Sequence, residues 1–206
     1  MARKRFGIMG GSFNPIHKGH LAIAKKAKKE FNLDTIIFVP TGTPPHKPPR
    51  SLADKEARYQ MVLKAIKRYP SYRASRTEID RRGYSYAVDT LNRLKTEFGE
   101  NSQLYYLMGM DSINEILEWK KPLDLFKYCE FVVATRPGAK IRTMKRLLKF
   151  PPLKFFKDKI HLIELKEAIS ASSIRDKINK GQDASKITPK SVLEYIMKKG
   201  LYREKH

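Results

Sequence analysis

Short apolar runs alternate with longer amphipathic stretches along this chain. Runs that are apolar on both faces, and that mostly end at Gly or Pro, predict buried strands. These runs cover residues 5–9, 35–39, 103–108, 131–135 and 160–165. Between and after them, apolar residues recur at helical spacing, which predicts helices. The helical stretches cover residues 18–31, 53–68, 86–98, 112–118, 171–180 and 189–199.

The alternation of strands with helices predicts an α/β fold with a doubly wound parallel sheet. Because both faces of the strands are apolar, helices are expected on both sides of the sheet. We see one domain, residues 1–206. In such sheets ligands bind at the carboxyl ends of the strands, near the point where strand order reverses. The turns after the predicted strands are therefore where a functional site is expected.

Composition narrows the class of protein. Of 206 residues, 41% are hydrophobic, which is enough for a real core. No apolar run is long enough to cross a membrane, so we expect no membrane association. The single cysteine, Cys129, excludes an intrachain disulfide framework and a multi-cysteine metal site. A chain without disulfides is typical of a reducing compartment, and we expect a cytoplasmic protein.

The chain is strongly basic. Its formal net charge is +22, and Lys outnumbers Arg 28 to 15. A charge of this size favours an anionic partner, and a basic nucleic-acid-binding protein without enzymatic activity is one hypothesis. The charge is spread along the chain, however, so a lysine-rich solvated surface explains it equally well. The basic and apolar residues 140–159 predict a helix and loop on the surface.

The turn after the first strand carries the strongest chemical signal. It contains Gly10, Gly11, His17 and His20, and a helix is predicted from residue 18. Paired glycines allow backbone N–H groups to approach an anion closely. A helix N-terminus adds donors and the positive end of a dipole. This combination predicts a site that binds a polyphosphate. Two alternatives stay open: the histidines could be helix-start residues without a functional role, or they could bind a metal ion as a pair that lacks a third ligand.

A second candidate turn follows the last predicted strand. Ser170 and Ser172 precede a helix, where serine is commonly just an N-cap, and Arg175 lies one turn into it. If the first and last strands lie side by side, both helix N-termini, the two histidines and Arg175 would face one anion. We expect this arrangement to bind the phosphates of a nucleotide.

These two turns carry a resemblance to a known group of enzymes. GSFNPIHKGH resembles the H-x-G-H signature of the nucleotidylyltransferase superfamily, and ISASSIR resembles its partner motif. The resemblance is strongest to bacterial-type nicotinate-nucleotide adenylyltransferases and extends over nearly the whole chain, in order. Further matching blocks are GGSFNPIHKGHL, VPTGTPPHK, SYAVDTL, GMDSINEILEW and FVVATRPG. The chain departs from the family at Met110, Ala87 and Ala171, where relatives usually have Ala, Thr and Ser.

The resemblance implies a Rossmann-like fold and adenylyl transfer from ATP to nicotinate mononucleotide, with release of pyrophosphate. It implies His17, His20 and Arg175 as catalytic residues that supply positive charge. For ATP it implies these three with Gly10, Ser12, Phe13, Asp111 and Ser172. For the acceptor it implies Lys47, Tyr86, Ala87 (through its backbone), Trp119 and Arg136. No residue is expected to ligate a metal; Mg²⁺ would be held mostly by the ATP phosphates and water.

Several alternatives stay open at this stage. Asp111 could be the N-cap of helix 112–118, Trp119 a core residue, and Lys47 and Arg136 ordinary surface charges. Another acceptor, such as pantetheine phosphate or a cytidylyltransferase substrate, would use the same chemistry. The expected partners are thus ATP and nicotinate mononucleotide, with no nucleic acid. A homo-oligomer is compatible with the sequence.

Overall fold

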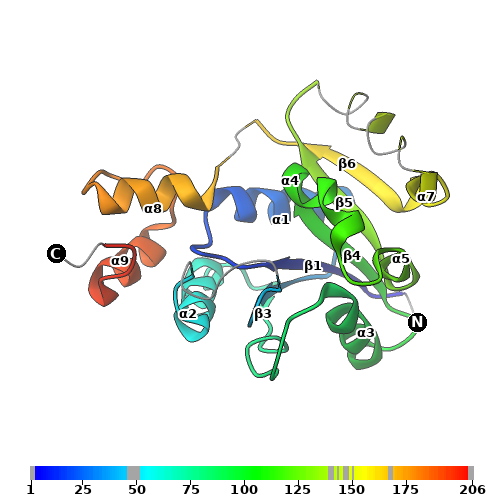
Figure 1. Ribbon diagram of the computed structural model, residues 1–206, viewed down its shortest axis with the longest axis horizontal. Helices are drawn as coiled ribbons and strands as arrows, with labels where there is room; N and C mark the ends of the chain where they lie inside the picture. Colours follow the sequence, from blue (N-terminus) through cyan, green and yellow to red (C-terminus); the bar gives the residue numbers. More distant parts are fainter. Residues whose placement is uncertain are drawn as a thin grey trace.

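A six-stranded parallel sheet forms the centre of the protein. The computed structural model describes residues 3–45, 52–138, 142, 144, 145, 149, 151–166 and 169–203, without the side chains of residues 111 and 114. The sheet order is β3-β2-β1-β4-β5-β6, and each neighbouring pair is parallel (Figure 1). The strands are β1 (Arg5–Gly11), β2 (Thr35–Pro40), β3 (Tyr72–Ala74), β4 (Gln103–Gly109), β5 (Cys129–Thr135) and β6 (Ile160–Glu164).

Helices cover both faces of this sheet. The longer ones are α1 (Lys18–Glu30), α2 (Lys55–Ile66), α3 (Ala87–Phe98), α8 (Ala171–Asn179) and α9 (Lys190–Lys199). The short α-helices are α4 (Met110–Asn114), α5 (Leu125–Tyr128) and α7 (Pro151–Lys154). The 3₁₀ helices are η2 (Ile116–Glu118), η3 (Pro122–Asp124) and η4 (Lys157–Lys159). In the described residues no helix is long and apolar enough to span a membrane.

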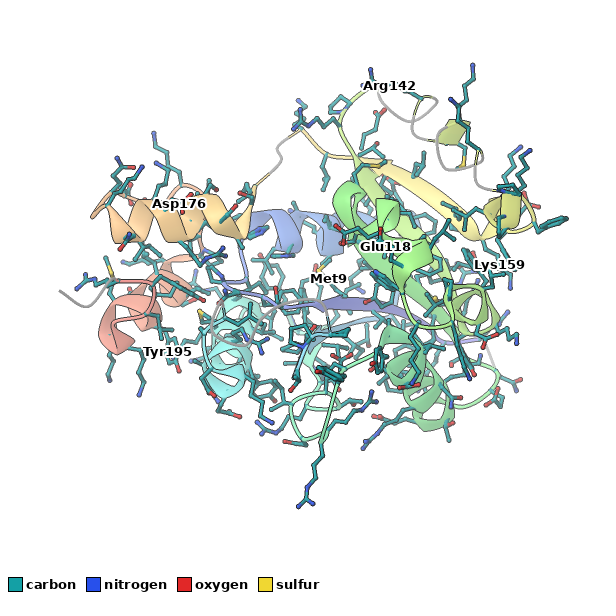
Figure 2. All side chains as sticks on the ribbon, in the orientation of Figure 1. Met9, Glu118, Arg142, Lys159, Asp176 and Tyr195 are labelled. Atoms are coloured by element: carbon teal, nitrogen blue, oxygen red, sulfur yellow. The ribbon has the colours of Figure 1, made fainter. Side chains whose placement is uncertain are left out.

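Successive strand residues supply two separate cores, because side chains alternate between the faces of a strand. Met9 packs with residues of α1, α2, α8 and α9, whereas Ile8 packs with residues of α3, α5 and α7. Figure 2 shows Met9 near the centre of the molecule, with Asp176 and Tyr195 on the helices at one end. The two-sided cover confirms the predicted doubly wound α/β fold.

All five predicted strands are present, with shifted ends. β1 continues to Gly11, which is in register with Pro40 of β2, so the turn that follows begins at Ser12. The sequence pattern missed β3 because three residues, Tyr72–Ala74, are too few for a periodicity. The predicted helix over 112–118 is instead the short helix α4 and the 3₁₀ turn η2.

The first and last strands do not lie side by side, so the condition under which the sequence brought the two turns together is not met. β4 and β5 lie between β1 and β6. Strand order reverses at β1 and β4, which places a switch point at their carboxyl ends. The chain after β6 nevertheless returns to this point, because α8 packs in the same core as α1.

The basic segment 140–159 lies partly outside the described residues. Arg142 is exposed at the periphery of the molecule (Figure 2). The segment is not wholly superficial, however, since Leu153 of α7 is buried. The ring of Phe156 also stacks on that of Phe126 of α5, with centroids 4.2 Å apart. Apolar anchors therefore fix the end of this segment against the body of the protein.

Candidate active site

The turn between β1 and α1 brings the two signature histidines into contact. His17 caps α1, and His20 lies in its first turn. Their rings stack with centroids 3.7 Å apart, and the His17 N–H donates to Nδ1 of His20 over 3.2 Å. His17 is buried, with 6% of its surface exposed, whereas His20 is partly exposed. This pairing holds both imidazoles in one fixed orientation at the helix N-terminus.

The surroundings of both imidazoles favour the neutral form, because they lower both pKa values. Burial lowers the pKa of His17 to about 4. Burial, and secondly the nearby His17, lowers the pKa of His20 well below its usual range. Because Nδ1 of His20 accepts a hydrogen bond, its ring proton is on Nε2, which can donate to a ligand. A neutral His20 would offer this ring N–H as a hydrogen-bond donor, and the supply of positive charge by His17 and His20 stays a prediction.

Two glycines that flank this turn, Gly10 of β1 and Gly19 of α1, lie in closely packed surroundings. A Cβ on Gly10 would lie 2.2 Å from the Tyr106 hydroxyl oxygen, so no side chain fits there. A Cβ on Gly19 would lie 3.0 Å from Nδ1 of His17 and 3.3 Å from Cβ of Ile169. The glycine of the H-x-G-H signature therefore lets α1 approach both the His17 ring and the segment that leads into α8.

The N-terminus of α1 is less open to an anion than the sequence predicts. The first helical N–H, that of Lys18, donates to the carbonyl of Ile187 over 3.1 Å. The N–H of His20 donates to the His17 carbonyl over 3.0 Å. Within the described part of the chain, this leaves the N–H of Gly19 in that turn without a backbone acceptor. The C-terminal segment thus occupies a donor that the sequence assigned to a phosphate.

The remaining predicted residues of this turn lie at different depths. Phe13 is 1% exposed, and its ring meets the His20 ring edge-on with centroids 5.0 Å apart. Its side chain supports His20 from inside the core, and its role in ATP binding stays a prediction. Ser12 is partly exposed at the start of the turn.

The start of α8 meets this turn from the other end of the chain. Arg175 donates through Nη1 to the carbonyl oxygen of Asn14 over 2.8 Å. Ser170 is the N-cap of α8, since its hydroxyl accepts from the Ser173 N–H over 3.2 Å. Ser172 is exposed beside it, with the two hydroxyl oxygens 3.1 Å apart. Arg175 therefore meets the turn between β1 and α1, which contains Asn14 and leads to His17 and His20.

A second group of predicted residues gathers beside Tyr106 of β4. The Trp119 ring meets the Tyr106 ring edge-on with centroids 5.9 Å apart, and Trp119 is partly exposed. Lys120 lies over the Tyr86 ring, 4.4 Å from its centroid, and its ammonium is 3.1 Å from the Asp89 carboxylate. These contacts hold the Trp119 segment against the start of α3. Tyr106 also touches the Gly10 turn, so the two groups share one neighbour.

Backbone donors near these aromatic residues come from α3. Tyr86 caps this helix and Ala87 is its first residue. The N–H groups of the first helical turn have no partner within the helix and can meet a carboxylate. The Trp119 N–H, by contrast, already donates to the Ile116 carbonyl over 3.2 Å. Backbone donors for a carboxylate are therefore offered by the start of α3 and not by the Trp119 N–H.

Three predicted residues remain. Lys47 lies outside the described residues. Asp111 is the second residue of α4, whose N-cap is Gly109, so the N-cap alternative for Asp111 is wrong. Arg136 is exposed directly after β5, at the same edge of the sheet. Gly109 and Ala134 are in register on β4 and β5, which places the chain segments of Asp111 and Arg136 on neighbouring strand ends.

Sequence reasoning missed two residues that organise the site. Asn14 accepts at Oδ1 from the Ala53 N–H over 3.0 Å and from the Tyr202 hydroxyl over 2.8 Å. Arg58 is buried in α2 on the apolar face that carries Met61 and Val62. The sequence signal for Arg58 was its position, three and four residues before the core residues Met61 and Val62, on the apolar face of the helix. Asn14 offered none beyond its place in the signature.

Comparison with known proteins agrees with this geometry. The family model described as cytidylyltransferase-like matches residues 8–177. A protein of Moorella thermoacetica named "Probable nicotinate-nucleotide adenylyltransferase" is 44% identical over 97% of this chain and 92% of its own length. A protein of Thermoanaerobacter with the same name is 43% identical over 97% of this chain and 95% of its own.

A solved structure has the same fold. It is the nicotinic acid mononucleotide adenylyltransferase of Plasmodium falciparum complexed with NaAD, with a TM-score of 0.77. It is 24% identical to this chain, and the match covers 97% of this chain and 98% of that one. At this identity the likeness establishes the architecture, a Rossmann-like α/β fold.

Proposed function

The chain belongs to the cytidylyltransferase-like family, and we propose that it transfers the adenylyl group of ATP to nicotinate mononucleotide. The products are nicotinate adenine dinucleotide and pyrophosphate, a step of NAD biosynthesis. The relatives named as nicotinate-nucleotide adenylyltransferases match this chain from end to end, at 36% to 44% identity. This protein is thus a nucleotidyltransferase.

The reaction requires little covalent chemistry from the protein. A phosphate oxygen of nicotinate mononucleotide attacks the α-phosphorus of ATP, and the bond from that phosphorus to the β-phosphate bridging oxygen breaks. The attacking phosphate is already ionised at pH 7, so no strong base is needed. The protein contributes by aligning the two phosphates and by stabilising charge on the transferring group and on the departing pyrophosphate.

We assign this work to the turn between β1 and α1 and to Arg175, which meets it. His20 would donate from its neutral Nε2–H to an oxygen of the transferring phosphate, with His17 stacked beside it. Arg175 would use the guanidinium donors that Asn14 does not occupy to hold the pyrophosphate oxygens. Gly10, Ser12 and Ser172 would line the nucleotide, as would Asp111. Phe13 would act through the orientation of His20.

The acceptor would bind on the side of Tyr106 that faces Trp119. The partly exposed Trp119 ring offers a surface for the pyridine ring, and the first turn of α3 offers N–H donors at Ala87 to its carboxylate. Arg136 and Lys47 would attract the acceptor phosphate. Tyr86 is held by Lys120 at the same helix start.

A magnesium ion would accompany the ATP. Among the described residues, no group of three or more His, Cys, Asp or Glu could hold a metal ion. An ion bound through phosphate oxygens and water needs no such cage, and these residues fit that mode of binding. When bound, it would neutralise part of the phosphate charge, and none of the roles assigned above depends on it.

One observation carries this proposal: the two signature segments, distant in sequence, meet at the Arg175–Asn14 hydrogen bond of 2.8 Å. The test is pyrophosphate release from ATP with nicotinate mononucleotide, pantetheine phosphate or no acceptor. We expect release with nicotinate mononucleotide alone. Release with pantetheine phosphate instead would transfer the assignment to a related enzyme with the same chemistry. Absence of release, together with salt-sensitive binding of nucleic acid, would favour the basic binding protein.

The remaining proposals concern the cellular compartment and the binding partners of the protein. A single buried thiol, Cys129, and two water-soluble substrates fit a cytoplasmic enzyme. Its partners would be ATP and nicotinate mononucleotide, not nucleic acid.

A further inference from the structure

Arg58 of α2 is a buried cation that donates hydrogen bonds to three backbone carbonyl oxygens. Its side chain is 1% exposed. Nε donates to the Ala53 carbonyl over 3.0 Å, Nη1 to that of Ser12 over 2.7 Å, and Nη2 to that of Gly42 over 3.0 Å. Within the described residues, no carboxylate forms an ion pair with it. A planar guanidinium thus bridges three separate stretches of backbone.

Two of these stretches adjoin residues assigned to the substrates: Ser12 is itself assigned to ATP, and Gly42 contacts Ser85, which precedes Tyr86 and Ala87 of the acceptor group. Ser12 opens the turn that leads to the signature histidines. Gly42 and Ala53 lie before and after the proline-rich residues 44–49, which include Lys47. Arg58 therefore binds the backbone on both sides of the stretch that contains Lys47, a residue assigned to the acceptor. The same guanidinium binds the turn that begins at Ser12, a residue assigned to ATP.

The neighbourhood leaves these stems little freedom. A Cβ on Gly42 would lie 2.1 Å from the carbonyl oxygen of Glu78, and the Gly42 N–H donates to the Ser85 hydroxyl over 3.2 Å. The Ala53 N–H donates to Asn14 Oδ1 over 3.0 Å. A shift of the turn after β1 must consequently be followed by the loop stems, or the hydrogen bonds of Arg58 must break.

We infer that Arg58 is a positioning residue that couples the ATP site to the acceptor site, so that binding of one substrate organises the other. The inference rests on the proposed function. An apolar side chain of similar length would suit this face of α2 without desolvating a cation, but it would leave the two turns unbridged. A lysine would supply one charge without the planar fork that reaches three carbonyls.

Coupling can be separated from mere stabilisation of the fold. Two ligands that organise the same element bind with a reciprocal coupling factor, which a purely structural residue would not change. Arg58→Lys and Arg58→Met remove the bridge. Met61→Ala, on the same face of α2 and fully buried, removes core packing but none of the three hydrogen bonds of Arg58.

The experiment measures the Kd of nicotinate mononucleotide with and without saturating α,β-methylene ATP, by titration calorimetry, for the wild type and all three variants. For the wild type and Met61→Ala we expect the analogue to tighten binding of the acceptor by about fivefold or more. For Arg58→Lys and Arg58→Met the factor should fall towards one, and KM for both substrates should rise more than kcat falls.

Other outcomes overturn the inference. No coupling in the wild type, or equal coupling in Arg58→Lys and Met61→Ala, would reduce Arg58 to a structural residue. If Arg58→Met does not fold, the lysine variant still decides the question. Failure of the proposed function is recognised separately, because the wild type would then release no pyrophosphate with nicotinate mononucleotide.

Discussion

The guanidinium of Arg175 donates a hydrogen bond of 2.8 Å to the backbone carbonyl of Asn14, across a sequence separation of 161 residues. The side-chain oxygen of Asn14 accepts from Tyr202, another residue of the C-terminal region, over 2.8 Å. Asn14 therefore links the C-terminal residues Arg175 and Tyr202 to the signature turn. The family's two motifs meet there although β1 and β6 are not neighbours.

This bond leads to a prediction for Arg175. One guanidinium nitrogen is occupied by Asn14, which leaves the other donors for phosphate oxygens. An ammonium could satisfy the carbonyl or the phosphate but not both in this geometry. We expect Arg175→Ala to lower kcat strongly and Arg175→Lys to restore only a small part. Full turnover of the lysine variant in a pyrophosphate-release assay would mean that charge alone is sufficient.

A second prediction concerns His20. Loss of a donor that acts in the transition state typically costs on the order of a hundredfold in kcat. His20→Ala should show a loss of this size, with a smaller change in ATP affinity. His161→Ala is the matched control, because His161 lies on β6 and pairs with Glu130 over 2.6 Å instead of joining the site. Equal turnover of the two variants would remove His20 from the mechanism.

The sequence pattern anticipated the two-sided sheet and the meeting of the two motifs, for identifiable reasons. Strands such as 35–39 are apolar on both faces, and a parallel sheet is the usual solution. The signature spacing fixed His17 and His20 at a helix start. Strand order could not be predicted, because nothing in the sequence of β6 distinguishes a strand at the edge of the sheet from a strand beside β1. Arg58 was hidden within an amphipathic pattern in which a single cation resembles a surface residue.

The protonation of the histidines was also beyond the sequence. Burial lowers the pKa of His17, and burial and secondly the nearby His17 lower the pKa of His20; both effects depend on tertiary packing. Likewise, the donor lost at Lys18 depends on the carbonyl of Ile187, which lies far along the chain. Local signals predict which groups are present, whereas the fold decides which of them remain available.

Gly10 gives a third prediction, in the form of a rescue. A methyl group at this position would collide with the Tyr106 hydroxyl oxygen, 2.2 Å from the new Cβ, and next with ring carbon Cζ at 3.1 Å. Gly10→Ala should therefore lower kcat/KM by at least tenfold, since it displaces either the nucleotide turn or the aromatic group beside Trp119. Adding Tyr106→Phe removes the nearer contact.

The double variant should recover part of this activity, while Tyr106→Phe alone should change it little. A double-mutant cycle of kcat/KM measures the interaction between the two substitutions. Strictly additive losses would show that the hydroxyl is not what the glycine accommodates.

His17 supplies a pH-dependent prediction about stability. Unfolded, it protonates near its ordinary pKa of 6.5, whereas burial lowers the folded pKa to about 4. Between these values the unfolded state binds more protons, so the free energy of unfolding falls as the pH drops from 7 towards 4. At pH 5 the loss from this residue amounts to roughly 1–2 kcal/mol.

The measurement is urea denaturation at pH 7 and pH 5 of the wild type and His17→Gln, which does not titrate. The wild type should lose more stability than the variant on acidification. The same loss in both proteins would show that His17 keeps an ordinary pKa in the folded state.

The central claim is adenylyl transfer to the acid mononucleotide, and its most direct test compares nicotinate with nicotinamide mononucleotide at fixed ATP in 0.15 M salt. Donors in the first turn of α3 suit a carboxylate, which only accepts hydrogen bonds, and leave the NH₂ of the amide facing a donor. That mismatch costs roughly 1–3 kcal/mol. We predict kcat/KM at least about tenfold higher for the acid. Equal values, a preference for the amide, or no pyrophosphate release with the acid would contradict the account.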